Sequence, residues 1–475
     1  MIEYAVVGSG IGGSSIAAYL DAKGHETVLF EKEPYLGGCS STFEHKGYAY
    51  NTGATTLAGY EEGHIVKSHF DDLGITPNII STDPSIVIIQ NGKTTPRFSD
   101  LETFLEVLEE NYPHPRNREF WTLIHTLGSK FYELKGHYYS NRTLWHKIVS
   151  LTSFLPLLAK FQRYLRINAY EFIQEFYGDI SEEYLRFLEA QILIVSQAPS
   201  REINFFTAAL SLGYTFNETH YVLGGFGAIF DQMTEKMKDV RRSTQIQKIE
   251  RHADHFTLHT KKEMIKAKKV ILNSTVYDSG KLFDQSDTEV EHYYKKYEKL
   301  NNYQSSFMLY MTIKSTKKYQ HHYQLIQDQT YVHTISNAVF VSFSDIADNV
   351  LCEEGHYSIT ASIHTDSRWW EDKTTYRAKK EALKNQMLKS ICDILDIDET
   401  QIVHHFAATP KSFKRYINRS QLGGNPITMK NFLPKLPSND TPIEGLYHVG
   451  DTVYAAQGWP GVMLGVDNLK RLLHV

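Results

Sequence analysis

Cysteine is scarce in this chain of 475 residues, and the few cysteines that it has are far apart. Cys39, Cys352 and Cys392 are too few for a disulfide framework and lack the close spacing of a zinc site, so we expect a reducing compartment. The 22 histidines show no His-Glu-x-x-His pattern or comparable ligand spacing, so we predict no metal centre. A net charge of −5 argues against a nucleic-acid partner.

Long apolar runs are also missing. No stretch of about 18 apolar residues occurs, so no segment is expected to span a membrane. No secretory leader is expected either, because the first residues have the pattern of a buried strand. We therefore expect a cytoplasmic protein that is soluble or peripheral on the inner face of the membrane. Aromatic residues are instead plentiful, and 30 Tyr and 25 Phe suit a large core as well as a long apolar ligand tunnel.

Residues 4–31 contain the most informative pattern. A short apolar strand is followed at once by a turn with glycines at Gly8, Gly10 and Gly13. A run with helical spacing of its apolar residues comes next, and a second apolar strand ends at Glu31. Strand, glycine turn, helix, strand and acid in this order predict a βαβ dinucleotide-binding unit.

Each part of this unit has a physical function in binding a dinucleotide. Gly8 allows the tight turn, Gly10 lets the backbone approach a pyrophosphate, and Gly13 lets the helix pack closely on the strand. The unpaired N–H groups of the helix N-terminus face the phosphates, and the Glu31 carboxylate can accept hydrogen bonds from ribose hydroxyls. The residues that we predict to contact the cofactor here are Gly8, Ser9, Gly10, Ile11, Gly12, Gly13, Glu31 and Lys32. The alternative is an ordinary glycine-rich turn.

Further motifs extend this pattern. The glycine pair Gly37–Gly38 follows the ribose acid closely, and near the end of the chain a strand ends in Gly450–Asp451 before a loop at residues 458–462. With these features the chain resembles the FAD-dependent amine oxidase and phytoene desaturase superfamily, and most of all its carotenoid isomerase and retinol saturase branch. The resemblance covers the head, a middle segment and the tail of the chain.

The resemblance implies FAD as the cofactor and assigns contacts to further residues. In the head these are Gly38, Cys39, Ser40, Ala54 and Thr55. Cys39 stands where the superfamily usually has Arg, and Asn51 replaces an Asp of the family pattern. A middle segment with Gly224–Gly225 returns the chain to the cofactor, where the backbone at Ile246 meets the adenine. A hairpin without any cofactor contact is the alternative.

At the tail, the resemblance implies that the Asp451 carboxylate bonds a ribityl hydroxyl and that the following helix directs its N-terminal amides at the reduced flavin ring. The residues assigned to the cofactor here are Gly450, Asp451, Gly458, Trp459, Pro460, Gly461 and Val462. Head and tail together favour FAD over NAD. Gln457 and Trp459 are the side chains that we expect nearest the ring, and Arg415 belongs to this region or is an ordinary ion-pair partner.

The expected fold is α/β, a Rossmann-type FAD-binding domain interleaved with an α+β substrate domain. The segments expected to form the FAD domain are 1–60, 216–275 and 440–475, and those expected to form the substrate domain are 61–215 and 276–439. The first substrate segment has mainly helical patterns. The second has strand patterns at 306–314, 330–343 and 356–363 and a helical pattern at 377–395.

Residues 144–163 mix apolar with basic side chains and lack acidic ones. One interpretation is a buried helix pair broken at Pro156. The other is an interfacial membrane patch through which a lipid-soluble substrate enters. The sequence leaves both interpretations open, and it does not indicate an oligomeric state.

The resemblance implies a flavoenzyme that acts on carbon–carbon double bonds of a long apolar polyene, such as a carotenoid or retinoid, by desaturation, saturation or cis–trans isomerisation. The flavin N5 would take or return a hydride while the protein orients the substrate and excludes water. Such chemistry needs few titratable groups, so we name no catalytic residue. One alternative is an amine oxidase with a small polar substrate, against which the lack of a cysteine in residues 454–457 counts mildly. The other is a non-catalytic flavoprotein.

Overall fold

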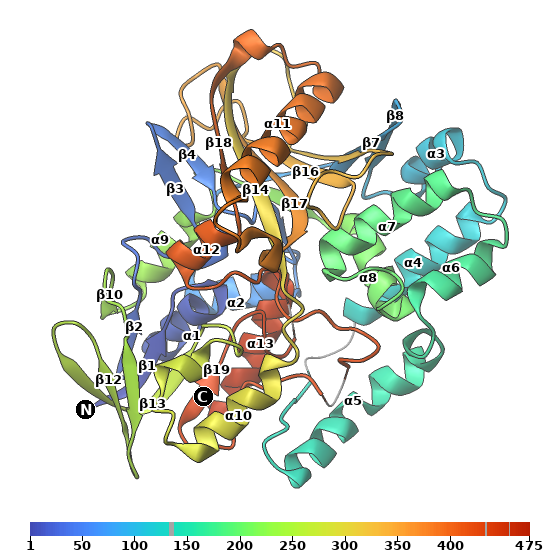
Figure 1. Ribbon diagram of the computed structural model, residues 1–475. Coiled ribbons are helices and arrows are strands. Elements are labelled where there is room, and N and C mark those ends of the chain that lie inside the picture. The colour runs from blue at the N-terminus through green and yellow to red at the C-terminus, as the bar shows by residue number, and fades with distance from the viewer. Residues whose placement is uncertain (133–136, 433–434, 456) are drawn as a thin grey trace.

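The computed structural model describes residues 1–132, 137–432, 435–455 and 457–475. Figure 1 shows three parts around a common centre: a sheet that includes the N-terminal strand, a second sheet above it, and a group of helices to the right. None of the helices in the described ranges has both the length and the hydropathy needed to cross a bilayer.

The first sheet contains the predicted βαβ unit. Its strands are β1 (Ile2–Val7), β2 (Thr27–Phe30), β10 (Val240–Arg241), β11 (Lys248–Arg251), β12 (Phe256–His259), β13 (Met264–Leu272) and β19 (Leu446–His448). Their order is β10-β2-β1-β13-β12-β11, with β19 also paired to β13. β1 is parallel to both β2 and β13, and α1 (Ile11–Ala22) connects β1 to β2. The Rossmann-type arrangement is confirmed.

Helices cover both faces of this sheet, because β2 and the C-terminal parts of β1 and β13 are apolar and buried on both faces. The helices are α2 (Ile65–Leu73), α9 (Gly227–Glu235), α10 (Thr288–Glu298) and α13 (Gly458–Leu473). Tyr4 and Val6 point to one face and pack with α1, α2, α9 and α13. Ala5 points to the other face, toward the tyrosines of α10. This alternation is the period of two of a strand, and it fixes α1 and α13 on the same side of the sheet.

The second sheet also has seven strands, in the order β18-β14-β17-β16-β15-β7-β8. They are β7 (Ile86–Gln90), β8 (Lys93–Arg97), β14 (Gln304–Lys314), β15 (His322–Ile326), β16 (Ala338–Phe343), β17 (His356–Asp366) and β18 (Ile402–Ala408). The outer face of this sheet packs on α11 (Tyr376–Leu395), with Phe307 and Ile363 buried against Leu383. The inner face of this second sheet lies over the first sheet, so we call it the roof sheet (Figure 1).

Two sequence expectations differ from the roof sheet. Of the predicted strand at 330–343, only Ala338–Phe343 is a strand. β7 and β8 come from the segment that we expected to be mainly helical. The reason is that β7 is a short, fully apolar run, and periodicity alone does not distinguish such a run from a buried helix.

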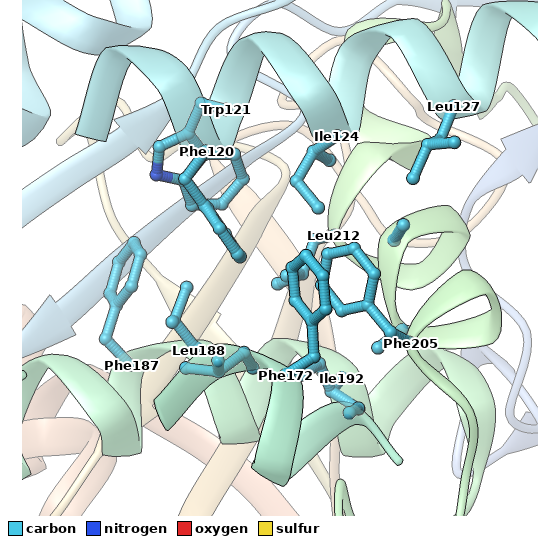
Figure 2. Packing of buried hydrophobic residues seen from close by; sticks show 14 of the residues in the cluster. Phe120, Trp121, Ile124, Leu127, Phe172, Phe187, Leu188, Ile192, Phe205 and Leu212 are labelled. Carbon is cyan, nitrogen blue, oxygen red and sulfur yellow. The ribbon is translucent and has the colours of Figure 1, made fainter. Parts of the chain in front are cut away.

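The helical group comprises α3 (Leu101–Asn111), α4 (Asn117–Tyr132), α5 (Leu144–Leu165), α6 (Ala169–Tyr177), α7 (Glu182–Ser196) and α8 (Phe205–Gly213). Most of these helices start after a polar residue whose side chain accepts a hydrogen bond from a backbone N–H of the first turn, as Asp100 does for α3 and Ser181 for α7. Figure 2 shows their shared core of aromatic and aliphatic side chains. Phe172 and Phe205 stack there with ring centroids 3.6 Å apart, which joins α6 to α8.

The helix α5 corrects one of the two interpretations of residues 144–163. The segment is a single helix that continues through Pro156, rather than a helix pair broken there. Proline removes one backbone hydrogen bond and usually bends or ends a helix. Here Phe154, Leu157 and Phe161 on the same face are buried, and their packing on both sides of the proline holds the helix together.

The roof sheet rests on a hairpin that belongs to the head of the chain. This hairpin consists of β3 (Thr42–His45) and β4 (Tyr48–Asn51). The Tyr310 hydroxyl on β14 donates to the Thr52 carbonyl at 2.7 Å, and the Thr360 hydroxyl on β17 donates to the Asn51 carbonyl at 3.2 Å. The remaining short elements are β5 (Leu57–Ala58), β6 (Ile79–Ser81), β9 (Thr219–Val222) and α12 (Pro410–Ile417).

Candidate cofactor and substrate site

A cavity of about 1260 Å³ lies where the first sheet, the roof sheet and the helical group meet. One part of its wall is formed by the glycine turn after β1 and by the tail of the chain. The other part is formed by apolar side chains of the helices and of the roof sheet. We call these parts the cofactor half and the substrate chamber.

The glycine turn is sterically constrained at the positions that the sequence indicated. A Cβ on Gly13 would lie 2.0 Å from the carbonyl oxygen of Gly8, so only glycine allows α1 to start so close to β1. Gly8 itself has φ +96, in the left-handed region. The N-terminal cap of α1 is Gly10, which offers no side-chain hydrogen bond. The first N–H groups of α1 therefore stay available for an anion in the cavity.

Asn273 is a wall residue that the sequence analysis did not assign to the site. It directly follows β13, and its backbone N–H donates to the Val7 carbonyl at 2.9 Å. A Cβ on Gly10 would lie 2.6 Å from the Asn273 side-chain nitrogen, and one on Gly450 would lie 2.9 Å from its side-chain oxygen. The Asn273 amide thus occupies the space between head and tail motifs, and a polar residue directly after an apolar strand was the only sequence signal for it.

The predicted ribose acid lies in the wall with part of its hydrogen-bonding capacity already used. One carboxylate oxygen of Glu31 accepts from the Ser9 N–H at 3.0 Å and from the Ser9 hydroxyl at 2.6 Å. The other accepts from the Glu33 N–H at 2.9 Å. A carboxylate has about four acceptor sites, so capacity remains for a ribose hydroxyl. Lys32 is also in the wall, but its ammonium group donates to the Arg415 carbonyl at 2.7 Å.

The glycine pair and the residues after the β3–β4 hairpin form the next section of the wall. Gly38, Cys39, Ser40, Ala54 and Thr55 all line the cavity. Burial raises the pKa of the Cys39 thiol to about 11, so it stays protonated. The Thr55 hydroxyl lies 2.7 Å from the Ser342 hydroxyl, and His322 of the roof sheet lies 3.0 Å from that same hydroxyl. The roof sheet thus positions this section of the cradle.

Ile246 is buried in the wall of the cofactor half, close to the predicted ribose acid. Two residues earlier, the Thr244 N–H donates to the Glu31 carbonyl at 2.7 Å. The middle segment therefore returns to the first sheet at its ribose end. A contact between Ile246 and an adenine stays a prediction.

The tail closes the cofactor half with a second helix N-terminus. Gly450 and residues 458–462 line the cavity, and α13 begins at Gly458 without a side-chain cap or an acidic residue in its first turn. The positive end of this helix dipole is therefore unneutralised at the cavity. The Gln457 amide nitrogen donates to the Val195 carbonyl at 3.0 Å, which ties the start of α13 to the helical group.

The Trp459 side chain lies mostly in the core. Its residue belongs to the wall, but its indole is 3% exposed and packs in the core of the first sheet beside Phe70, Phe226 and Phe230. A contact between the Trp459 ring and the flavin stays a prediction.

An ion pair at the tail links two segments that sequence reasoning treated separately. Arg419 donates to both carboxylate oxygens of Asp451, at 2.9 Å and 3.1 Å. The carboxylate of Asp451 raises the pKa of the Arg419 guanidinium against the opposing effect of burial, which is the largest influence on that group. The ion pair at this site is therefore formed by Arg419, whereas Arg415 contributes a backbone carbonyl. The ribityl contact assigned to Asp451 stays a prediction.

The substrate chamber is lined mainly by apolar groups from several elements. Phe154 and Leu157 come from α5, Phe206 and Leu210 from α8, and Phe340 from the roof sheet. The carboxylates among the described lining residues are Glu31, Glu33, Asp451 and Asp467. Each has a partner: Asp467, for example, accepts from Arg471 at 3.1 Å, and Glu33 lies 3.5 Å from the Lys32 ammonium. The chamber is therefore mainly apolar, and each carboxylate of the described wall already accepts a hydrogen bond or forms an ion pair.

The comparison with protein families matches residues 6–73 to an NAD(P)-binding Rossmann-like domain. A prolycopene isomerase of Daucus carota is 24% identical over 490 residues, which cover 95% of this chain and 77% of that protein. A 4,4'-diapophytoene desaturase of Staphylococcus haemolyticus is 22% identical over 97% of this chain and 96% of its own. An all-trans-retinol 13,14-reductase of Rattus norvegicus is 30% identical over 24% of this chain and 19% of its own.

Solved structures share the fold over the whole chain. An oxidoreductase from Methanosarcina mazei has a TM-score of 0.64 at 18% identity and covers 99% of this chain and 100% of its own. A putrescine oxidase bound to putrescine has a TM-score of 0.65 at 13% identity and covers 100% of this chain and 98% of its own. At such identities these similarities establish the fold alone.

Proposed function

The chain belongs to the FAD-dependent phytoene desaturase, carotenoid isomerase and retinol saturase-like family of the amine oxidase superfamily, and we propose that it acts on the carbon–carbon double bonds of a long apolar polyene. It is an FAD-dependent oxidoreductase by family. The reaction is the desaturation, saturation or cis–trans isomerisation of a carotenoid-like or retinoid-like chain.

The observation that supports this proposal best is the continuity of the cavity. The same space of about 1260 Å³ joins a dinucleotide cradle of glycines and helix N-termini to a chamber of aromatic and aliphatic side chains. A long apolar substrate gains binding free energy by burying its surface in such a chamber. A polyene long enough to fill the chamber would place one of its carbon–carbon bonds in the cofactor half.

The residues of the cofactor half fit an FAD. A Cβ on Gly10 or Gly12 would lie within 2.8 Å of the Asn273 or Val449 side chain, so the glycines let the turn before α1 pack closely on these wall residues. The N-termini of α1 and α13 provide N–H groups for phosphate and for negative charge on a flavin ring. When bound, FAD supplies hydride acceptance and donation at its ring. The protein contributes orientation of the substrate and exclusion of water, through the apolar walls and the overlying roof sheet.

The same walls argue against a small amine as the substrate. An ammonium group in a buried chamber needs an opposite charge, such as an unpaired carboxylate, to offset the cost of desolvation. The carboxylates in the described wall already accept hydrogen bonds or form ion pairs with Arg419, Arg471 or Lys32. The amine oxidase alternative therefore lacks a charged partner for its substrate in the described part of the chamber.

The helix α5 supports a second element of the proposal, contact with an anionic membrane surface. Its outward face exposes Leu144, Trp145, Ile148, Leu151 and Leu155, of which Trp145 is 69% exposed. Its inward face places Phe154 and Leu157 in the chamber wall. The helix contains basic but no acidic residues. An interfacial helix with these two faces would let a lipid-soluble substrate pass from the bilayer into the chamber.

The proposed activity is tested with the FAD-loaded protein under anaerobic conditions in detergent. The substrates are lycopene-type carotenoids and retinol, each incubated with oxidised and then with reduced flavin and analysed by chromatography and flavin absorbance. A change in double-bond geometry or number supports the proposal, and the flavin state required identifies the reaction. If no polyene changes while a small amine bleaches the flavin, the amine oxidase alternative replaces it.

A further inference from the structure

One part of the inner face of the roof sheet packs on the β3–β4 hairpin, and another part faces the cavity. The row of Tyr310 and Thr360 binds the end of the β3–β4 hairpin through hydrogen bonds to Thr52 and Asn51. The next rows toward the other end of the same strands are Met308 opposite Ser362, and Ser306 opposite His364. All four of these side chains line the cavity. Their strand neighbours point to the opposite face, toward α11, which confirms that the four share the cavity face.

Three of these four residues carry hydrogen-bonding groups in a chamber that is otherwise mainly apolar. The described residues provide no hydrogen-bond partner for the hydroxyls of Ser306 and Ser362 or for Nδ1 of His364. His364 is 8% exposed, so its ring is buried in the wall. A buried polar group without a partner is unfavourable. Such groups at the wall of a ligand cavity are the usual device for orienting a ligand.

The tautomer of His364 follows from its neighbour Gln197, the residue at the C-terminal end of α7. The Gln197 amide nitrogen donates to the Ile194 carbonyl at 2.7 Å, which fixes the orientation of the amide. Its oxygen accepts from the Gln304 amide at 2.7 Å and lies 3.1 Å from Nε2 of His364. Nε2 must therefore carry the hydrogen. Burial lowers the pKa of His364 to about 4, so near neutral pH the ring presents the lone pair of Nδ1.

The position of this polar patch relative to the cofactor half follows from two glycines. A Cβ on Gly423 would lie 2.3 Å from the Gln197 side-chain oxygen, so Gly423 packs directly on the residue that orients His364. A Cβ on the adjacent Gly424 would lie 2.5 Å from the backbone oxygen of Asp451, in the cofactor wall. The patch of Ser306, Ser362 and His364 therefore lies at the junction of the substrate chamber and the cofactor half.

We propose that Ser306, Ser362 and His364 form a binding site for a hydroxyl group of the substrate, so that the preferred substrate is a polyene alcohol rather than a hydrocarbon. An alcohol can donate its hydrogen to Nδ1 of His364 and accept a hydrogen from a serine hydroxyl. A carboxylate would place its lone pairs against that of Nδ1, and a hydrocarbon would leave all three groups unpaired. The inference rests on the proposed function, because it specifies the substrate of the same chamber.

The test compares ligand binding to the FAD-loaded protein, measured by quenching of tryptophan emission in detergent. The probes are all-trans-retinol, its methyl ether, which lacks the hydroxyl hydrogen, and lycopene. The wild-type protein is expected to bind retinol about tenfold more tightly than the ether, the effect of one hydrogen bond. His364→Phe removes the acceptor of the hydroxyl hydrogen and is expected to bring this ratio near one. Ser306→Ala removes a donor to the ligand oxygen, so it is expected to weaken retinol and the ether alike while lycopene binding stays unchanged. Met308→Leu, on the same face but without a hydrogen-bonding group, is expected to leave the ratio unchanged.

The outcomes separate this inference from the proposed function. Equal binding of retinol and ether by the wild-type protein, a ratio that survives in His364→Phe, or retinol binding that Ser306→Ala leaves unchanged overturns the hydroxyl site while the polyene proposal stands. If neither retinoid nor lycopene binds, both proposals fail. Ser306→Ala keeps the test decisive if His364→Phe does not fold, because it removes only one oxygen atom from a half-buried position.

Discussion

Arg419 and Asp451 form a two-point ion pair in the wall of the cavity, with nitrogen–oxygen distances of 2.9 Å and 3.1 Å. The side chains are 14% and 23% exposed, so water screens the pair only in part. The same guanidinium makes a further hydrogen bond, from its Nε to the Gln421 carbonyl at 2.8 Å. The pair joins the segment after α12 to the start of the tail, two parts of the cofactor half that the chain supplies separately.

Replacing Arg419 by Met is expected to destabilise the protein, because Asp451 then keeps its charge without a partner in a poorly hydrated site. The expected loss is about 3 kcal/mol in the free energy of unfolding, measured by denaturant titration of the apoprotein. The double variant Arg419→Met with Asp451→Asn is expected to recover at least half of that loss. A double variant no more stable than the single one would show that packing of the arginine, rather than its charge, stabilises this wall.

Glu31→Ala is expected to weaken FAD binding about ten- to hundredfold, the effect of a charged hydrogen bond of about 1.5–3 kcal/mol. The measurement is fluorescence titration of the apoprotein with FAD. Glu31→Gln is the matched control, since it keeps the shape and one acceptor but removes the charge, and an intermediate affinity is expected. Unchanged affinity in the alanine variant would mean that the Glu31 carboxylate bonds only its internal partners, Ser9 and the Glu33 N–H.

Gly13→Ala is expected to prevent α1 from packing on β1, because the added Cβ would lie 2.0 Å from the Gly8 carbonyl oxygen. A loss of about 3 kcal/mol or more is expected, seen as a lower thermal midpoint or as no folded protein. Gly128→Ala in α4 is the matched control. Its Cβ would meet nothing within 4 Å, so the gain in helix propensity should stabilise the protein by about 0.5–1 kcal/mol. Equal effects of the two changes would contradict the steric argument.

Polar replacement of the outward face of α5 is expected to reduce membrane association. The triple variant Trp145→Gln, Ile148→Gln and Leu155→Gln removes exposed apolar area from the helix. Phe154 is left unchanged, because it is buried and lines the chamber. Flotation with vesicles that contain anionic lipid should fall about tenfold or more.

The control for α5 replaces two exposed apolar residues elsewhere. Met264 is 70% exposed and Val403 is 47% exposed, and both lie outside α5. Their change to Gln should leave flotation as in the wild-type protein. Flotation that is equal in all three proteins, or absent from all, would remove the membrane contact from the proposal.

Stability is expected to fall in mild acid because His448 is buried in its neutral form. Burial lowers its pKa to about 3 in the folded protein, against an ordinary value of about 6.5 in the unfolded chain. As the pH falls below about 6.5, the unfolded state takes up the proton first, so stability present above that pH is lost progressively toward pH 3. Between pH 7 and pH 5 the contribution is about 2 kcal/mol.

The control for this effect is a side chain that does not titrate. His448→Gln can still bond the Tyr294 hydroxyl, which lies 2.8 Å from Nε2 of His448. From pH 7 to pH 5 the free energy of unfolding of the wild-type protein should fall by about 2 kcal/mol more than that of the variant. A difference between the two proteins that is constant with pH would contradict the assignment.

The sequence by itself determined the local parts of this protein. The glycine turn, α1 and β2 follow from residue order within about thirty positions, because turn sterics and helical spacing act between near neighbours. The start of α13 at Gly458 follows in the same way. The resemblance carried by these motifs supplied the family and the cofactor.

Tertiary structure alone decided which distant residues complete the site. Asn273 fills the gap between Gly10 and Gly450, and Ser306 faces the same cavity as His364, only because strand register places them there. The indole of Trp459 faces the core because α13 packs on the first sheet. Contacts of this kind depend on how faces pack across hundreds of residues, and no local pattern in the chain encodes that arrangement.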